Sequence, residues 1–189
     1  TDGDGKFDIG NNTSQKTWTE ANWNTYVNAL DSFQDTGIIV FALSNNDGKT
    51  DSDVSAGLPE LFSELEEAWL NVANIDIEGT STKTYTLKSA PCGSTAEYCL
   101  AADGTDILMP GGSQYLSGGF YYKVATGTSF AAPQVSGAIA LLNEAFPNHT
   151  PEMIADRLLA SANNSTSITG AHTAAVTFGN SVQHGYNST

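Results

Sequence analysis

The feature that most constrains the fold is an unbroken apolar run, Ile-Ile-Val-Phe-Ala-Leu, at residues 38–43. A short run without polar alternation is typical of a strand buried on both faces of a parallel sheet. The preceding residues, 17–36, predict a helix, because their apolar side chains recur at helical spacing: Trp23, Val27, Leu30 and Phe33. Thr17 or Thr19 is positioned to cap this helix, and Gly37 to end it.

Extended and helical patterns alternate along the rest of the chain. Residues 69–77 predict a second strand, and shorter strands are expected at 85–87, 99–101 and 106–109. Residues 58–67 suit a short helix or a turn. Two longer helices are expected, one over 128–145 and one from Pro151 to about Ala162, where Thr150 can act as the cap. This alternation implies an α/β fold with a largely parallel sheet. Residues 163–189 are poorly patterned.

The charge balance excludes several classes of partner. The formal net charge is −14, and only seven residues are Lys or Arg. They form no basic patch, so neither nucleic acid nor an anionic membrane surface is an expected partner. No apolar run approaches the length of a membrane span. Residues 1–10 are polar and acidic, unlike a signal peptide, so a secreted protein of this sequence would have its signal upstream of Thr1.

The chain has two cysteines, Cys92 and Cys99, which are close enough in sequence to close a small loop. We expect a disulfide in preference to two free thiols, and hence an oxidising compartment. The acidic residues Asp2, Asp4 and Asp8 suggest a calcium loop at first sight. Lys6 occupies a ligand position there and no matching Glu follows, so we expect a solvated acidic turn and no metal site.

The most informative segment is Gly-Thr-Ser-Phe-Ala-Ala-Pro-Gln-Val-Ser-Gly at residues 127–137. It puts Ser129 at the first turn of an expected helix, where free N–H groups and the helix dipole stabilise negative charge. Such groups can hold the oxyanion that forms when a serine oxygen attacks a carbonyl. Pro133 is expected within about the first turn. A plainer interpretation is that Ser129 only caps the helix.

The whole string resembles the nucleophile segment of the subtilisin-like serine proteases, the subtilases or peptidase S8 family. The resemblance implies a three-layer fold with a mainly parallel central sheet flanked by helices. It also implies a secreted serine endopeptidase that acts on proteins or peptides through an acyl-enzyme on Ser129, without a cofactor. A lipase-type hydrolase is disfavoured, because no Gly-x-Ser-x-Gly motif surrounds this serine.

A second segment, Ser-Asn-Asn-Asp-Gly at residues 44–48, resembles the loop of that family whose asparagine donates to the oxyanion. The alignment makes Asn46 the donor. Asn45 stands where the family usually has glycine, so a one-residue shift to Asn45 is the alternative. The same resemblance implies that Leu43, Ser44 and Asn45 form one wall of the substrate-binding pocket.

Two further stretches resemble the subtilase passengers of bacterial autotransporters. They are Leu-Pro-Glu-Leu with the later Trp-Leu-Asn-Val, from residue 58, and the paired cysteines followed by Leu-Ala-Ala. Asp103 and Gly104 stand where Pro-Gly is usual. This resemblance covers roughly residues 38–162 and implies an extracellular or bacterial cell-surface location.

The catalytic histidine and aspartate of the family are expected upstream of the asparagine loop, and no matching motif occurs there. All three histidines, His149, His172 and His184, follow Ser129. We therefore expect residues 1–189 to be the C-terminal half of a catalytic domain whose upstream half is its partner, in the same chain or a nicked one. Alone, it should be inactive. The alternative is a catalytically inactive, protease-like binding or structural module.

Overall fold

The computed structural model describes residues 19–111, 122–162 and 168–169. The acidic turn expected at Asp2–Asp8, most of the tail from residue 163, and His172 and His184 lie outside these residues. In the described part, no helix is both long and apolar enough to cross a membrane.

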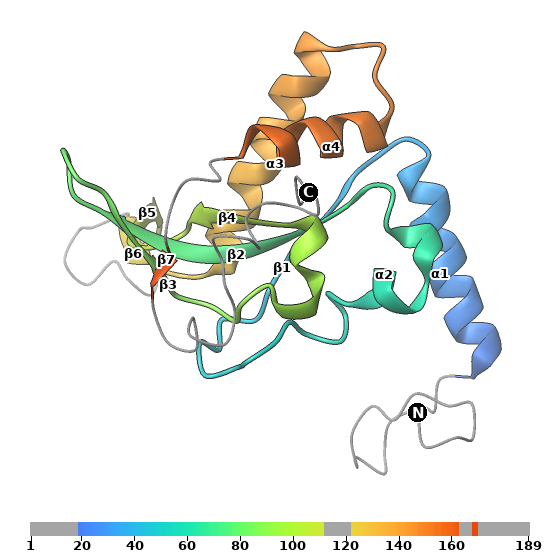
Figure 1. Ribbon diagram of the computed structural model, residues 1–189, viewed down its shortest axis with the longest axis horizontal. Coiled ribbons are helices and arrows are strands. Elements are labelled where there is room, and N and C mark those ends of the chain that lie inside the picture. Colours follow the sequence, from blue (N-terminus) through green and yellow to red (C-terminus); the bar gives the residue numbers. More distant parts are fainter. Residues whose placement is uncertain (1–18, 112–121, 163–167, 170–189) are drawn as a thin grey trace, which may run out of the picture.

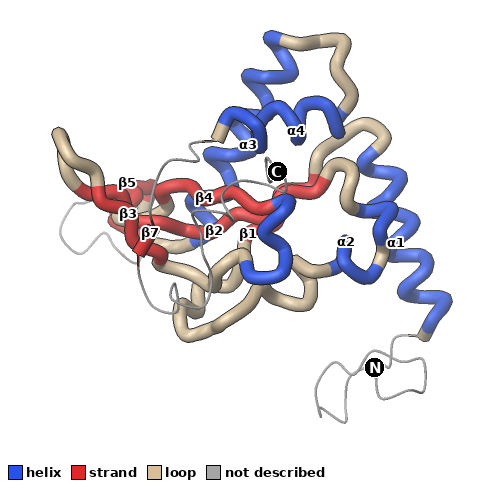
Figure 2. Tube along the Cα trace, in the orientation of Figure 1, coloured by secondary structure: helices blue, strands red, loops and turns tan. Residues whose placement is uncertain are grey.

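The main sheet is organised around one long strand, β2 (Trp69–Glu78). Strands β1 (Ile39–Ala42) and β4 (Cys99–Asp103) run parallel to it on opposite edges, because both pair with Asn71 and Val72. The far end of β2 pairs antiparallel with β3 (Thr84–Leu87), which pairs in turn with β7 (Ile168–Thr169). Figure 2 shows these strands as one twisted layer. The predicted α/β class with parallel pairing at its centre is confirmed.

Helices cover the two faces of this sheet and make three layers (Figure 1). Helices α3 (Thr128–Ala145) and α4 (Pro151–Ser161) pack on one face. The other face carries α1 (Glu20–Gln34), α2 (Leu58–Leu61) and the 3₁₀ turn η1 (Ser63–Leu65). A second 3₁₀ segment, η2 (Gly93–Tyr98), leads into β4, and a separate hairpin joins β5 (Ile107–Pro110) to β6 (Tyr122–Ala125).

Alternation along β2 explains why this strand lies at the centre. Leu70 and Val72 belong to the cluster under α3 and α4, whereas Trp69, Ala73 and Ile75 point to the clusters on the other face. All five are buried. Fully burying an aliphatic or aromatic side chain stabilises the fold by roughly 1.5–3 kcal/mol. A strand that is apolar on both faces is therefore stable only between two helical layers.

The helix ends follow the predicted caps. The Thr19 hydroxyl accepts a hydrogen bond from the N–H of Asn22, and the Thr150 hydroxyl accepts one from the N–H of Met153. At the end of α1, the N–H of Gly37 donates to the carbonyl of Phe33. A Cβ on Gly37 would lie 2.5 Å from the Phe33 ring, so a larger residue here would require this half-exposed ring to move.

Three details differ from the sequence-based expectations. Residues 58–67 form two short helical turns instead of one element. Strand β6 was not expected, because its pairing with β5 depends on a partner some 15 residues away and its own four-residue pattern is weak. Phe33, expected on the buried face of α1, is half exposed and covers Gly37 instead.

Candidate active site

Ser129 is the second residue of α3 and its side chain is exposed, whereas Gly127 and Thr128 before it are buried. Gly127 occupies the cap position, so the interpretation of Ser129 as a helix cap is wrong. Neither the N–H nor the hydroxyl of Ser129 makes a hydrogen bond to a described residue. Both groups are therefore free to meet a ligand at the positive end of the helix dipole.

Asn45 lies directly against this turn. Its Oδ1 accepts the backbone N–H of Thr128 at 2.8 Å and the Thr128 hydroxyl at 3.1 Å. The same hydroxyl donates to the carbonyl of Leu43 at 2.7 Å. With its oxygen fixed in this way, the Asn45 carboxamide keeps its Nδ2 donors free of any described partner. Thr128 thus holds the loop after β1 against the start of α3.

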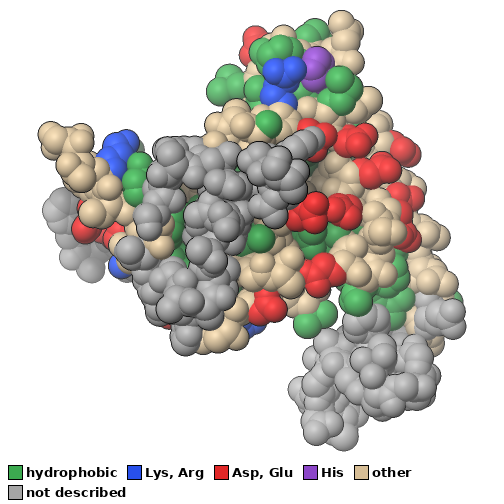
Figure 3. Space-filling view, in the orientation of Figure 1, with side chains coloured by type: hydrophobic (Ala, Val, Ile, Leu, Met, Phe, Trp, Pro, Cys, Tyr) green, Lys and Arg blue, Asp and Glu red, His purple; other side chains and the backbone are tan. Residues whose placement is uncertain are grey.

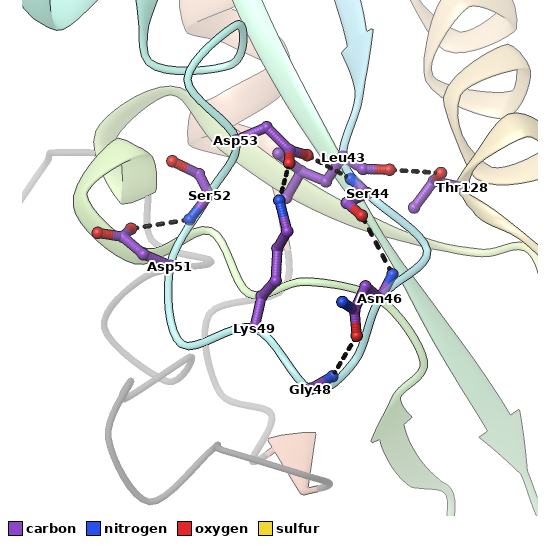
Figure 4. Close-up of polar contacts among 9 residues, drawn as sticks. All are labelled: Leu43, Ser44, Asn46, Gly48, Lys49, Asp51, Ser52, Asp53 and Thr128. Atoms are coloured by element: carbon purple, nitrogen blue, oxygen red, sulfur yellow. Dashed lines mark hydrogen bonds and ion pairs between the residues drawn. The ribbon is translucent and has the colours of Figure 1, made fainter. Parts of the chain in front are cut away.

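Asn46 makes a different, local contact. Its Oδ1 accepts the N–H of Gly48 at 3.0 Å, and its own N–H donates to the Ser44 hydroxyl at 3.2 Å. Figure 4 shows this side chain folded over its own loop, where it closes a turn. The structure thus brings Asn45 next to the Ser129 turn, whereas the Oδ1 of Asn46 is bound within residues 44–48.

The expected pocket wall has few free backbone groups. The N–H of Leu43 donates to the carbonyl of Val72, and its side chain is buried in the core. The N–H of Ser44 donates to Asp53, which also pairs with Lys49 (Figure 4). Neither N–H is available to a substrate backbone, and the carbonyls of Leu43 and Ser44 already accept hydrogen bonds from Thr128 and Ala90.

A tight junction supports the nucleophile turn from below. The N–H of Gly127 donates to the carbonyl of Gly104, and the N–H of Gly104 donates to Oδ1 of the buried Asn74 in β2. A Cβ on Gly104 would lie 2.5 Å from the Gly127 carbonyl and 2.9 Å from the Ala131 nitrogen. Sequence reasoning did not find Asn74 or assign a role to Gly104, because neither carries a local signal.

Asp51 ties the asparagine loop to the segment before β4. It accepts hydrogen bonds from the N–H groups of Ser52 and Ser94, both at 2.8 Å. Partial burial raises the pKa of this carboxyl, but the hydrogen bonds from Ser94 and Ser52 outweigh burial and hold the pKa below its ordinary value of 3.8. The loop that carries Asn45 is thereby anchored at a second point.

The sequence model of the subtilase family, Peptidase_S8, matches residues 5–182. This chain belongs to the subtilase family. It is 32% identical over 126 residues to serotype-specific antigen 1 of Mannheimia haemolytica, covering 66% of this chain and 13% of that protein. It is 29% identical over 133 residues to an extracellular serine protease of Serratia marcescens, covering 62% and 12%. The subtilase chain therefore spans about an eighth of these two relatives.

The fold of this subtilase is also found among solved structures. Sphericase superposes with a TM-score of 0.54 at 20% identity, over 81% of this chain and 48% of that one. This similarity shows the fold, which is an α/β fold with its sheet between two helical layers.

Two other expectations can be followed in the subtilase structure. Cys92 and Cys99 form a disulfide, as predicted, and both are buried. His149 lies beyond the far end of α3, which extends for about 24 Å after Ser129, and contacts Phe146 and Arg157. Among the described residues, no histidine is within reach of the serine and no cluster could hold a metal ion.

Proposed function

We propose that this subtilase chain supplies the nucleophile and oxyanion site of a secreted serine endopeptidase. The observation that carries the proposal is the contact of Asn45 with Thr128, which sets a fixed carboxamide beside an exposed serine. We take residues 1–189 to be the C-terminal half of the catalytic domain. The histidine base and the aspartate that orients it come from sequence outside this chain.

In the proposed reaction, Ser129 Oγ attacks the carbonyl carbon of a peptide bond while the histidine accepts its proton. The oxyanion accepts hydrogen bonds from the Ser129 N–H and a side-chain amide. The histidine then protonates the departing amine, which leaves an acyl-enzyme on Ser129. Water, deprotonated by the same histidine, releases the acid and restores the serine. No step requires a cofactor.

We assign the side-chain donor to Asn45 instead of Asn46. An oxyanion donor must be fixed before the reaction, because reorientation in the transition state costs free energy. Thr128 fixes the Asn45 oxygen, and this leaves the nitrogen as the free end of the carboxamide. The Asn46 carboxamide is bound within its own turn. Leu43 and Ser44 remain candidates for the pocket wall that binds the substrate side chain.

We propose an extracellular or bacterial cell-surface location. Support comes from the two relatives, whose names describe an extracellular serine protease and an antigen. The disulfide between Cys92 and Cys99 fits an oxidising compartment. More narrowly, we propose that the chain is part of the subtilase passenger of a bacterial autotransporter.

The experiment is fluorophosphonate labelling of the mature protein from its natural source, followed by intact mass and peptide mapping. We expect one adduct, on Ser129, which is lost in the Ser129→Ala variant. An adduct requires an activated serine, hence a histidine from outside residues 1–189. No adduct on folded, uninhibited protein would contradict the proposal and favour a protease-like binding module.

A further inference from the structure

A group of carboxylates lies at the end of the sheet opposite Ser129. Two cavities, of about 400 Å³ and 200 Å³, share Glu67 and Glu152 as walls. We call them together the acidic trough. Seven of the chain's 21 acidic residues line it: Asp31, Asp35, Glu66, Glu67, Glu97, Glu152 and Asp156. Its described walls contain no Lys, Arg or His. Figure 3 shows acidic side chains gathered on this face, where α1 and α4 approach each other.

The position of the acidic trough follows from the sheet. Glu66 and Glu67 precede β2, and Glu97 precedes β4, so they lie at the amino ends of these parallel strands. Asn45 follows the carboxyl end of β1, at the other edge of the layer. A ligand in the trough would therefore not touch the proposed nucleophile.

Two buried oxygen atoms in the walls lack partners. The Tyr98 side chain lines the larger cavity, is 6% exposed, and its hydroxyl has no hydrogen-bond partner among the described residues. Gln34 lines the smaller cavity and is also 6% exposed. Its Nε2 donates to the Leu65 carbonyl, whereas its Oε1 has no partner in the part of the chain that the structure describes. Unpaired buried polar atoms are costly, so each of these oxygens would be stabilised by a hydrogen-bond donor that reached it from the trough.

Helix electrostatics add to the negative potential. Asp31 and Asp35 lie at the carboxyl end of α1, where the helix dipole is already negative and no basic residue occupies the last turn. Burial and then the charges of Glu60, Glu66 and Glu97 raise the pKa of Tyr98 well above its usual range. A positive charge bound here would be attracted to the carboxylates of Asp31, Asp35 and their neighbours.

We propose that the acidic trough binds an extended organic cation that carries two or more ammonium or guanidinium groups. A single metal ion fits poorly, because no described cluster of three metal-ligating side chains is close enough to hold one. The apolar walls, Trp69, Ala155 and Leu159, suit the aliphatic stem of such a group. Basic segments of polypeptides and free polyamines share this chemistry.

The test is calorimetric titration of the full-length protein as the Ser129→Ala variant, so that peptides are not cleaved. The probes are a penta-arginine peptide, spermine and Ca²⁺ at low ionic strength. We expect saturable binding of the organic cations with one site per chain, which weakens at high salt. Tighter binding of the peptide would identify a polypeptide ligand, and tighter binding of spermine a polyamine.

Matched charge changes locate the site. The double variant Glu67→Gln/Glu152→Gln, which changes both shared walls, should weaken binding about tenfold. The control Glu78→Gln/Glu144→Gln removes the same charge from exposed positions outside the trough and should stay within about twofold. Equal losses in both variants would mean diffuse attraction to an acidic surface and would overturn the proposal.

Tyr98→Phe tests the trough without changing its charge. It should weaken penta-arginine or spermine binding about threefold, because a hydrogen-bond acceptor is lost. Its thermal unfolding should be no less cooperative than that of the parent, because only an unpaired hydroxyl is removed. Unchanged affinity in both the Tyr98 and the Glu67/Glu152 variants, or Ca²⁺ displacing the organic cations at equal concentration, would also overturn the proposal.

Discussion

The side-chain oxygen of Asn45 accepts two hydrogen bonds, whereas its side-chain nitrogen has no partner among the described residues. Both hydrogen bonds from Thr128 end on Oδ1. The orientation of the carboxamide is then set before any ligand arrives. Gly127 contributes to the fit, since a Cβ there would lie 3.1 Å from the same oxygen. Gly127 and Thr128 thus position Asn45, which lies more than 80 positions earlier in the sequence.

The first prediction separates the two asparagines. Under the proposed function, Asn45→Ala in the full-length protein should lower kcat by about 10²–10³-fold with little change in KM, the loss known for one such donor in subtilisin, a member of the same family. Asn46→Ala should lower kcat by less than about fivefold, because it loses only a turn hydrogen bond. Steady-state kinetics on a peptide substrate measures both. The reverse order of effects would return the donor role to Asn46.

The second prediction concerns Asp51 and acid. Its pKa is lower in the folded chain than the ordinary value of 3.8, so the folded state binds a proton less readily than the unfolded state. The resulting stabilisation is fully present above about pH 5 and is lost as the pH falls through the folded pKa. Asp51→Asn should therefore be less stable than the parent at pH 6, and the difference should shrink below pH 4.

Thermal unfolding at a series of pH values measures this difference. Glu78→Gln, which alters an exposed acid at the end of β2, is the matched control. A difference for Asp51→Asn that stayed constant from pH 6 to pH 3 would mean that the hydrogen bonds from Ser52 and Ser94 do not depend on its charge.

At the level of elements, the junction of β4, β2 and α3 has no spare volume at Gly104. The third prediction is that Gly104→Ala destabilises the fold by about 1–3 kcal/mol, since its Cβ would meet backbone atoms that cannot move independently. It should also reduce fluorophosphonate labelling of Ser129, because Gly127 must shift. Chemical denaturation and labelling rates measure the two effects.

Gly137 provides the control within α3. It is exposed, and a Cβ there meets nothing within 4 Å. Gly137→Ala should raise the free energy of unfolding by about 0.5–1 kcal/mol, because alanine loses less backbone entropy in a helix. If both glycine variants were neutral, the close packing at Gly104 would not be a determinant of stability.

Elements that are determined by neighbouring residues could be predicted from the sequence, whereas contacts between distant residues could not. Strand β1, the caps Thr19 and Thr150, and the bounds of α3 follow from nearby residues, and all were predicted. Pro133 was expected near the first turn of α3 but lies in its second, where the bond from its position to the Ser129 carbonyl is missing. The choice between Asn45 and Asn46 depends on Thr128, and no pattern within residues 44–48 reveals that contact.

For the whole molecule, the net charge of −14 opposes folding through self-repulsion. The fourth prediction is that sodium chloride raises the free energy of unfolding between about 0.02 and 0.5 M, because the Debye length falls well below the spacing of the surface charges. Denaturation in urea, which is uncharged, measures this change. The Glu67→Gln/Glu152→Gln variant should show a smaller salt effect than the parent, since the acidic trough concentrates the repulsion. An equal salt effect would argue against such concentration.

The contacts of Thr128 also have a consequence for the order of folding. Its bonds to Leu43 and Asn45 close loops of 85 and 83 residues, whereas the helix caps form within three. Closing a long loop costs entropy that only late, cooperative packing repays, so such contacts form slowly. The helices and the start of the sheet can thus assemble while the turn that carries Ser129 still lacks its contact with Asn45. Under the proposed function, the nucleophile turn would be complete only after the chain that carries it has become compact and resistant to cleavage.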